Sequence, residues 1–83
     1  MKKIILIGCS GILGKYFLKE LKKNSYVLAA ADIKIKKNFS SKKLFFSKIN
    51  IENENEIENF LKIIKKKYGN FDILINNAAL TSE

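Results

Sequence analysis

Three evenly spaced glycines, directly after a short apolar run, constrain the fold of this chain more than any other feature. The run from Ile4 to Ile7 is continuous and mostly β-branched, which indicates a strand buried on both faces. Gly8, Gly11 and Gly14 follow, and a helical pattern begins between the last two. Gly8 can turn the chain sharply out of a strand, and Gly14 can let a helix pack close to a sheet. The order of strand, glycine turn and helix predicts an α/β fold with a parallel sheet.

Strand and helix patterns alternate along the rest of the chain. Further strands are predicted over residues 26–31, 44–49 and 71–75, and residues 33–43 are predicted to be a polar loop with at most one helical turn. Helices are predicted over residues 12–23 and 53–68, with buried faces formed by Ile12, Leu13, Phe17, Leu18 and Leu21 in the first and by Ile57, Phe60, Leu61, Ile64 and Tyr68 in the second. Asn53 and Glu56 form a capping-box pattern at the start of the second helix, and Gly69 suits the left-handed position after it. The chain order is therefore β-α-β-β-α-β, with no full helix predicted between the second and third strands.

The glycine turn can hold a phosphate group. Gly11 removes a side chain where a backbone must approach a pyrophosphate, and the unpaired N–H groups of the first helical turn attract negative charge. The predicted phosphate-binding residues are Gly8, Ser10, Gly11, Ile12, Leu13 and Gly14. Cys9, between them, is interpreted as a small filler of the turn; the alternative is a thiolate favoured by the helix N-terminus.

Asp32 ends the second predicted strand, and Ile33 follows it. An acidic residue at this place, about 20 residues after the glycines, hydrogen-bonds a ribose 2′-hydroxyl and repels a 2′-phosphate. This favours NAD as the cofactor over NADP, although the lysines that follow at positions 34, 36 and 37 could attract a phosphate. The alternative is that Asp32 only caps a loop.

The chain resembles the short-chain dehydrogenase/reductase family over essentially its whole length. The glycine turn and Asp32 are similar to that family's cofactor motifs, and residues 69–79 are similar to its G-x-x-D-x-L-x-N-N-A-G segment. The resemblance implies a Rossmann-type three-layer fold whose first and fourth strands are neighbours. It also implies that Asn77, Ala78 and Ala79 line the adenosine side of the site. The pair Asn50 and Ile51 takes the place of an aspartate and an apolar residue beside the adenine, and the asparagine oxygen can accept the same hydrogen bond.

The family's chemistry is hydride transfer assisted by a serine, a tyrosine and a lysine four residues after the tyrosine. The residues four positions after Tyr16, Tyr26 and Tyr68 are Glu, Ala and Asp, so no such pair is present and no catalytic residue is predicted. We therefore expect residues 1–83 to be the N-terminal, dinucleotide-binding part of an NAD(P)-dependent oxidoreductase, inactive alone. We expect only a full-length parent protein to bind the small-molecule substrate. The resemblance implies that this parent is a homo-oligomer. The G-x-x-G-x-x-G spacing is more typical of members acting on sugars or sugar-nucleotides. The alternative is a regulatory module that binds a dinucleotide without turnover.

The net charge of +8 comes from sixteen lysines without any arginine. Because nucleic-acid binders use the bidentate fork of arginine, a nucleic-acid partner is a less favoured alternative, involving residues 33–43 and 62–67. Lysine, isoleucine and asparagine all have A/T-rich codons, so genome composition is the simpler explanation. The chain contains no histidine, and no metal site is predicted.

The first residues partly imitate a secretion signal, since two lysines precede an apolar run that ends at Gly8 and Cys9. The run has only four residues, fewer than the roughly 7–15 of a secretory core. No stretch approaches the roughly 20 apolar residues of a membrane span. A cytoplasmic protein without a membrane partner is expected, and the single cysteine agrees with this.

Overall fold

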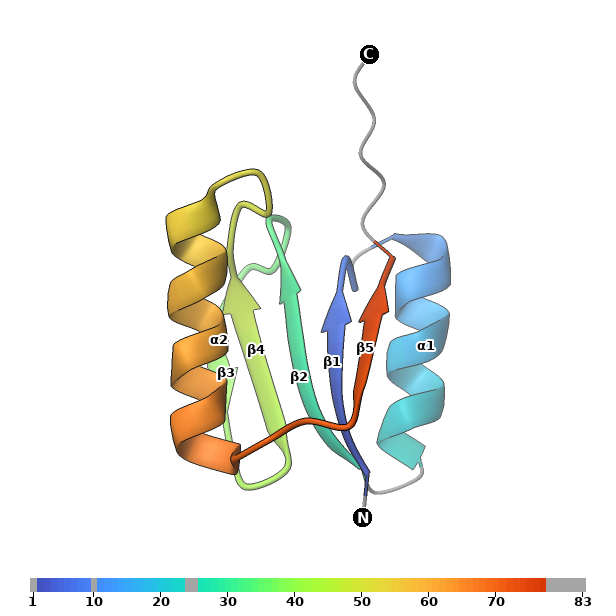
Figure 1. The fold of residues 1–83 in the computed structure, drawn as a ribbon. Coiled ribbons are helices and arrows are strands. Elements are labelled where there is room, and N and C mark those ends of the chain that lie inside the picture. Colours follow the sequence, from blue (N-terminus) through green and yellow to red (C-terminus); the bar gives the residue numbers. More distant parts are fainter. Residues whose placement is uncertain (1, 10, 24–25, 78–83) are drawn as a thin grey trace.

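Five strands form one sheet, with one helix on each face (Figure 1). The structure is a computed structural model that describes residues 2–9, 11–23 and 26–77, with the side chains of residues 12 and 13 outside the description. The elements in chain order are β1 (Lys3–Ile7), α1 (Ile12–Lys23), β2 (Val27–Asp32), β3 (Phe39–Ser40), β4 (Leu44–Lys48), α2 (Glu54–Tyr68) and β5 (Ile73–Asn76). The predicted order of strands and helices is confirmed, apart from the additional strand β3.

The sheet has the strand order β3-β4-β2-β1-β5. β1 pairs in parallel with both β2 and β5, and β2 pairs in parallel with β4. β3 pairs antiparallel with β4, so the prediction of a loop over residues 33–43 was wrong for two residues. A tight turn forms this hairpin, because the Ser41 N–H donates to the Leu44 carbonyl at 2.7 Å. No helix forms between β2 and β4, as predicted.

Alternate residues of the central strands pack against opposite helices. On one face, Ile5, Ala29 and Ala31 pack with Phe60 and Ile64 of α2. On the other face, the half-buried side chains of Phe17, Leu18 and Leu21 of α1 pack against buried strand residues. These strand residues are Ile4, Leu6, Leu28 and Ala30. This arrangement confirms the predicted three layers, and it explains why β1 is apolar from Ile4 to Ile7 and β2 from Val27 to Ala31.

The start of α2 is capped as predicted, but the capping box is displaced. The Asn53 Oδ1 accepts hydrogen bonds from the backbone N–H groups of Asn55 and Glu56 at 3.0 and 3.2 Å. The Glu56 Oε1, however, accepts from the N–H of Asn50 at 2.8 Å instead of from Asn53. The reason is that the Asn53 N–H already donates to the Asn50 carbonyl at 3.0 Å. At the other end, Gly69 has a φ of 84° and its N–H donates to the Lys65 carbonyl, as expected for a helix end.

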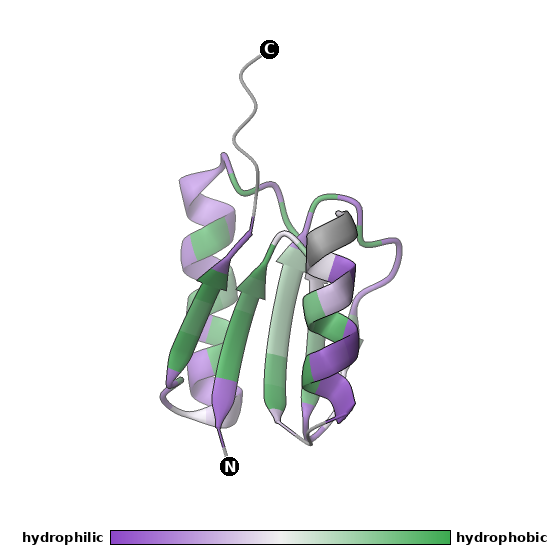
Figure 2. Cartoon of the chain, turned by 90° about the vertical axis from the view of Figure 1, so that its right-hand side faces the viewer, coloured by the Kyte–Doolittle hydropathy of each residue, from purple (hydrophilic) through white to green (hydrophobic). Residues whose placement is uncertain are grey.

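The sheet is uncovered along β5. Ile73 and Leu74 are 40% and 62% exposed, and Figure 2 shows the apolar β5 standing beside the region that α1 covers. Leu61 of α2, predicted to be buried, is 41% exposed. It lines an open apolar hollow of about 260 Å³ together with Ile5 and Phe71, and within residues 2–9, 11–23 and 26–77 the sheet ends at β5. An edge strand of this kind is an aggregation hazard.

Candidate dinucleotide site

Four predicted site residues follow the carboxyl ends of the parallel strands. Gly8 follows β1, Asp32 ends β2, Asn50 lies just after β4, and Asn77 follows β5. Parallel strands end at one edge of a sheet, so all four lie along the same edge. The chain moves outward from β1 to β2 and β4, and then returns to the other side of β1 as β5. Ligands of open α/β sheets bind beside such a reversal, which places the candidate site over β1 and β5.

The glycine turn has the geometry that its sequence predicts. Gly8 has a φ of 84°, a left-handed conformation that favours glycine, and its N–H donates to the Ala31 carbonyl at 2.8 Å. A Cβ on Gly14 would lie 2.2 Å from the Gly8 carbonyl oxygen and 2.8 Å from the Cys9 Cα, so only glycine fits. A Cβ on Gly11 would meet no heavy atom of the described residues within 4 Å. The turn is therefore tight on its sheet side and open at Gly11.

Helix α1 begins directly at this turn. Its first backbone hydrogen bond runs from the Lys15 N–H to the Gly11 carbonyl at 2.8 Å. The N–H groups before Lys15 belong to the first turn and lack partners within the helix. No acidic side chain lies in that first turn, so the positive end of the helix dipole is not offset there. Ser10 and the side chains of Ile12 and Leu13 lie outside the described residues.

Asn77 connects the end of β5 to the glycine turn. Its backbone N–H donates to the Ile7 carbonyl at 2.8 Å. Its side-chain Nδ2 donates to the Gly8 carbonyl at 3.3 Å. The structure thus brings together two residues that are 69 positions apart in the sequence and were predicted to share one site. Ala78 and Ala79 lie outside the described residues.

Asp32 closes the turn after β2. Its Oδ1 accepts from the Lys34 N–H at 2.9 Å, and its carbonyl accepts from the N–H groups of Ile35 and Ile49 at 3.4 and 3.3 Å. Asp32 therefore has the loop-capping role that was the alternative interpretation. The same contacts fix the half-buried carboxylate at the edge where a ribose is predicted, and Ile33 beside it is 51% exposed.

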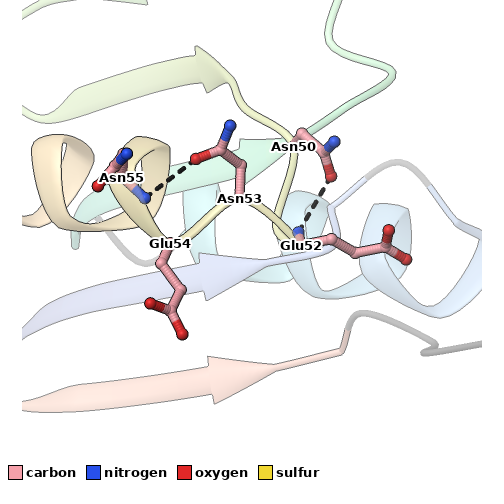
Figure 3. A pocket seen from close by; sticks show the side chains of 5 residues that line it. All are labelled: Asn50, Glu52, Asn53, Glu54 and Asn55. Atoms are coloured by element: carbon pink, nitrogen blue, oxygen red, sulfur yellow. Dashed lines mark hydrogen bonds between the residues drawn. The ribbon is translucent and has the colours of Figure 1, made fainter.

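Asn50 and Ile51 form the turn between β4 and α2. The Asn50 Oδ1 accepts from the Glu52 N–H at 3.0 Å (Figure 3). This is the oxygen predicted to accept from an adenine amino group, and an amide oxygen has a second lone pair for such a bond. Ile51 packs half-buried against the α2-side core. A shallow polar pocket of about 520 Å³ lies here, lined by Asn50, Glu52, Asn53, Glu54 and Asn55.

The hydrogen bonds of Tyr68 could not be predicted from the sequence, which indicated only that Tyr68 lies on the buried face of α2. Its hydroxyl donates to the carbonyls of Ser41 and Leu44, at 2.6 and 3.2 Å. Burial raises the pKa of Tyr68 above its usual value, and hydrogen bonds at Ser40 and Ser41 act in the opposite direction. These partners lie at the amino ends of the strands, so Tyr68 anchors α2 to the hairpin and is remote from the glycine turn.

Within the described ranges, no group of three or more acidic, cysteine or histidine residues is placed to hold a metal ion. None of the helices in the same ranges is long and apolar enough to cross a membrane. The cytoplasmic location stays a prediction.

The model of the short chain dehydrogenase family matches residues 2–83. The chain belongs to this family. A short chain dehydrogenase from Bacillus anthracis has a TM-score of 0.81 at 24% identity, covering 94% of this chain and 35% of its own. A short chain dehydrogenase from Leptospira borgpetersenii, solved with bound NAD+, has a TM-score of 0.81 at 22% identity, covering 96% of this chain and 32% of its own. No curated protein matches. The present chain thus spans about a third of the length of these two structures. Their similarity to it supports the fold.

Proposed function

We propose that this chain binds NAD over the ends of β1 and β5, as the cofactor-binding part of an oxidoreductase. The observation that carries the proposal is the meeting of the Asn77 side chain with the Gly8 carbonyl at 3.3 Å, beside the exposed Gly11. A glycine turn, a helix N-terminus and the end of a returning strand are thereby placed at one reversal of strand order.

The chemistry of these groups fits a dinucleotide. Gly11 leaves space for a pyrophosphate, and the N–H groups at the start of α1 favour its negative charge. The Asp32 carboxylate can accept from a ribose hydroxyl, and Asn50 and Ile51 offer a polar and an apolar group for the adenine. Bound NAD supplies or accepts a hydride.

In the family, a tyrosine with a lysine four residues later transfers the proton that accompanies the hydride. None of the tyrosines among these 83 residues has such a lysine. We therefore infer that turnover needs groups outside this chain. The chain would then be the N-terminal part of a larger enzyme. The substrate class, a sugar or sugar-nucleotide, and the homo-oligomeric parent stay predictions.

A Gly11→Ala variant tests the pyrophosphate site without disturbing the turn. The added Cβ meets no described atom, so the far-ultraviolet circular dichroism spectrum should be unchanged. NAD affinity, measured by titration calorimetry, should fall at least about ten-fold, since a methyl group would occupy the space of the phosphate. Unchanged affinity would contradict the proposed site.

An Asp32→Ala variant tests the choice of cofactor. Loss of the carboxylate should weaken NAD binding and improve NADP binding, because the repulsion of the 2′-phosphate disappears while the neighbouring lysines remain. The ratio of the two affinities is the measurement, and Glu52→Ala is the control at an exposed acid on the same edge. If both variants change the ratio equally, the assignment of Asp32 fails.

A further inference from the structure

The edge of the sheet opposite the candidate dinucleotide site collects most of the chain's positive charge. The parallel strands begin at this edge, and both helices end there (Figure 1). α1 ends in Lys22 and Lys23, and α2 carries lysine from position 65 to position 67 in its last turn. We call residues 2–3, 22–23, 42–43 and 65–67 the basic end.

Backbone contacts hold the remaining members of the basic end beside the helix ends. The Lys2 carbonyl accepts from the Val27 N–H at 3.1 Å, and the Lys43 carbonyl accepts from the Leu28 N–H at 2.7 Å. The Lys3 Nζ donates to the carbonyl of Tyr68, the last residue of α2. The lysines at the starts of β1 and β4 therefore adjoin the start of β2 and the end of α2.

The charge is distributed unevenly between the two edges. The basic end holds nine of the sixteen lysines, and the acidic residues close to it are Glu20 and Asp72. At the carboxyl edge, five lysines are balanced by five acidic residues; the lysines are at positions 15, 34, 36, 37 and 48, and the acidic residues are at positions 32, 52, 54, 56 and 58. Codon composition explains how many lysines the chain has, but it does not explain this separation.

Helix dipoles account for part of the separation. Cations are stabilised near helix C-termini, which favours lysine at positions 22–23 and 65–67. Lys2, Lys42 and Lys43 precede strands and Lys3 begins β1, so none of them receives this benefit from a helix of its own, although the Lys3 Nζ contacts the end of α2. Nine like charges at one end also repel one another, and a polyanion would relieve that repulsion.

We propose that the basic end binds the anionic surface of a lipid bilayer, a peripheral contact that departs from the expectation of no membrane partner drawn from the sequence. The lysines lie at the ends of both helices and at the starts of β1 and β4, all at one end of a three-layer molecule, an arrangement that suits a planar partner (Figure 1). Lysine clusters bind such surfaces through charge alone. Nucleic acid fits less well, because the chain has no arginine and the rings at this end, those of Tyr26, Tyr68 and Phe71, are half-buried and unsuited to base stacking. Adsorption at this edge leaves the opposite, dinucleotide-binding edge exposed to solvent.

The test is co-sedimentation of the full chain with phosphatidylcholine vesicles, with and without phosphatidylserine. Binding should require phosphatidylserine and should be lost near about 0.5 M NaCl. A variant with four substitutions at the basic end should bind at least about 100-fold more weakly. The substitutions are Lys42→Glu, Lys43→Glu, Lys66→Glu and Lys67→Glu. The matched control carries Lys34→Glu, Lys36→Glu, Lys37→Glu and Lys48→Glu, which change the net charge equally at the other edge and should weaken binding far less.

Three results would overturn the proposal, provided that circular dichroism shows both variants folded. One is absence of phosphatidylserine-dependent binding by the unmodified chain, and another is equal loss of binding in the two variants. The third is tighter binding to a DNA duplex than to vesicles at the same salt concentration, which would assign the basic end to nucleic acid. The vesicle measurements contain no dinucleotide, so their outcome is independent of the proposed cofactor site.

Discussion

The two turns that lead from a strand into a helix at the carboxyl edge differ in nearly every chemical respect. The turn into α1 is built of glycines and has no acidic side chain in the first helical turn. The turn into α2 contains Asn50 and Asn53, and Glu54 and Glu56 lie in the first helical turn. Both helices present a positive dipole end to the same edge, but only α2 has acidic residues in its first turn to offset it.

The difference teaches which helix N-terminus serves stability and which is available to a ligand. At α2, the Asn53 Oδ1 satisfies two N–H groups and the Glu56 carboxylate satisfies the Asn50 N–H. These side chains do for α2 what a bound anion would do for α1. A phosphate is therefore expected at the glycine turn and not in the polar pocket beside α2.

The largest expected effect is that of Gly14→Ala. The new Cβ would lie 2.2 Å from a backbone oxygen and 2.8 Å from a backbone carbon, so the helix must move away from β1. We expect a loss of about 3 kcal/mol in the free energy of unfolding and loss of NAD binding. Urea denaturation measures the first. Gly11→Ala serves as the control and should cost less than about 1 kcal/mol. Equal costs for the two glycines would show that the turn is not packed as described.

A smaller effect is expected from Asn53→Ala at the other turn. The substitution removes the acceptor of two backbone N–H groups, and loss of such a cap costs about 1 kcal/mol. Urea denaturation should show this loss, while NAD affinity per folded molecule should stay within about two-fold, because the hydrogen bonds of the Asn53 side chain stay within the start of α2. A ten-fold loss of affinity would break the distinction between a structural and a ligand-binding helix start.

The smallest effect is expected when α1 is made to resemble α2. Lys15→Glu places a carboxylate near the start of α1, where it should repel a pyrophosphate and weaken NAD binding about three-fold. Lys19→Glu makes the same charge change one turn further along the same helix and should have less effect, because the influence of the helix end falls off within a turn. Titration calorimetry of both variants gives the comparison. Equal effects would indicate that only the net charge matters.

The parts of the fold that depend on local chemistry could be predicted from the sequence. The bounds of α1, the capping of α2 by Asn53 and the conformations of Gly8 and Gly69 each follow from a few adjacent residues. β3 could not be predicted, because its two residues are ordered by pairing with β4 and not by their own pattern. The exposure of Leu61 also depends on a distant feature, the position of β5 at the edge of the sheet in the described part of the chain.

The candidate site was predictable in the same uneven way. The glycine spacing identified the turn, and the proximity of Asn77 to Gly8 followed from the family resemblance once β5 was placed beside β1. The bond from the Lys34 N–H to Asp32 was foreseen only as an alternative. The Glu56 bond to Asn50 could not be derived, since it depends on how the turn between β4 and α2 is folded.

Backbone NMR titration of the full chain with NAD tests the central claim most directly. We expect the amide signals of Gly8, Gly11, Gly14 and Asn77 to shift together and to saturate together, with smaller shifts at Asp32 and Asn50. The amides of residues 53–56 should change little. Shifts centred on the start of α2, or on the basic end, would contradict the account.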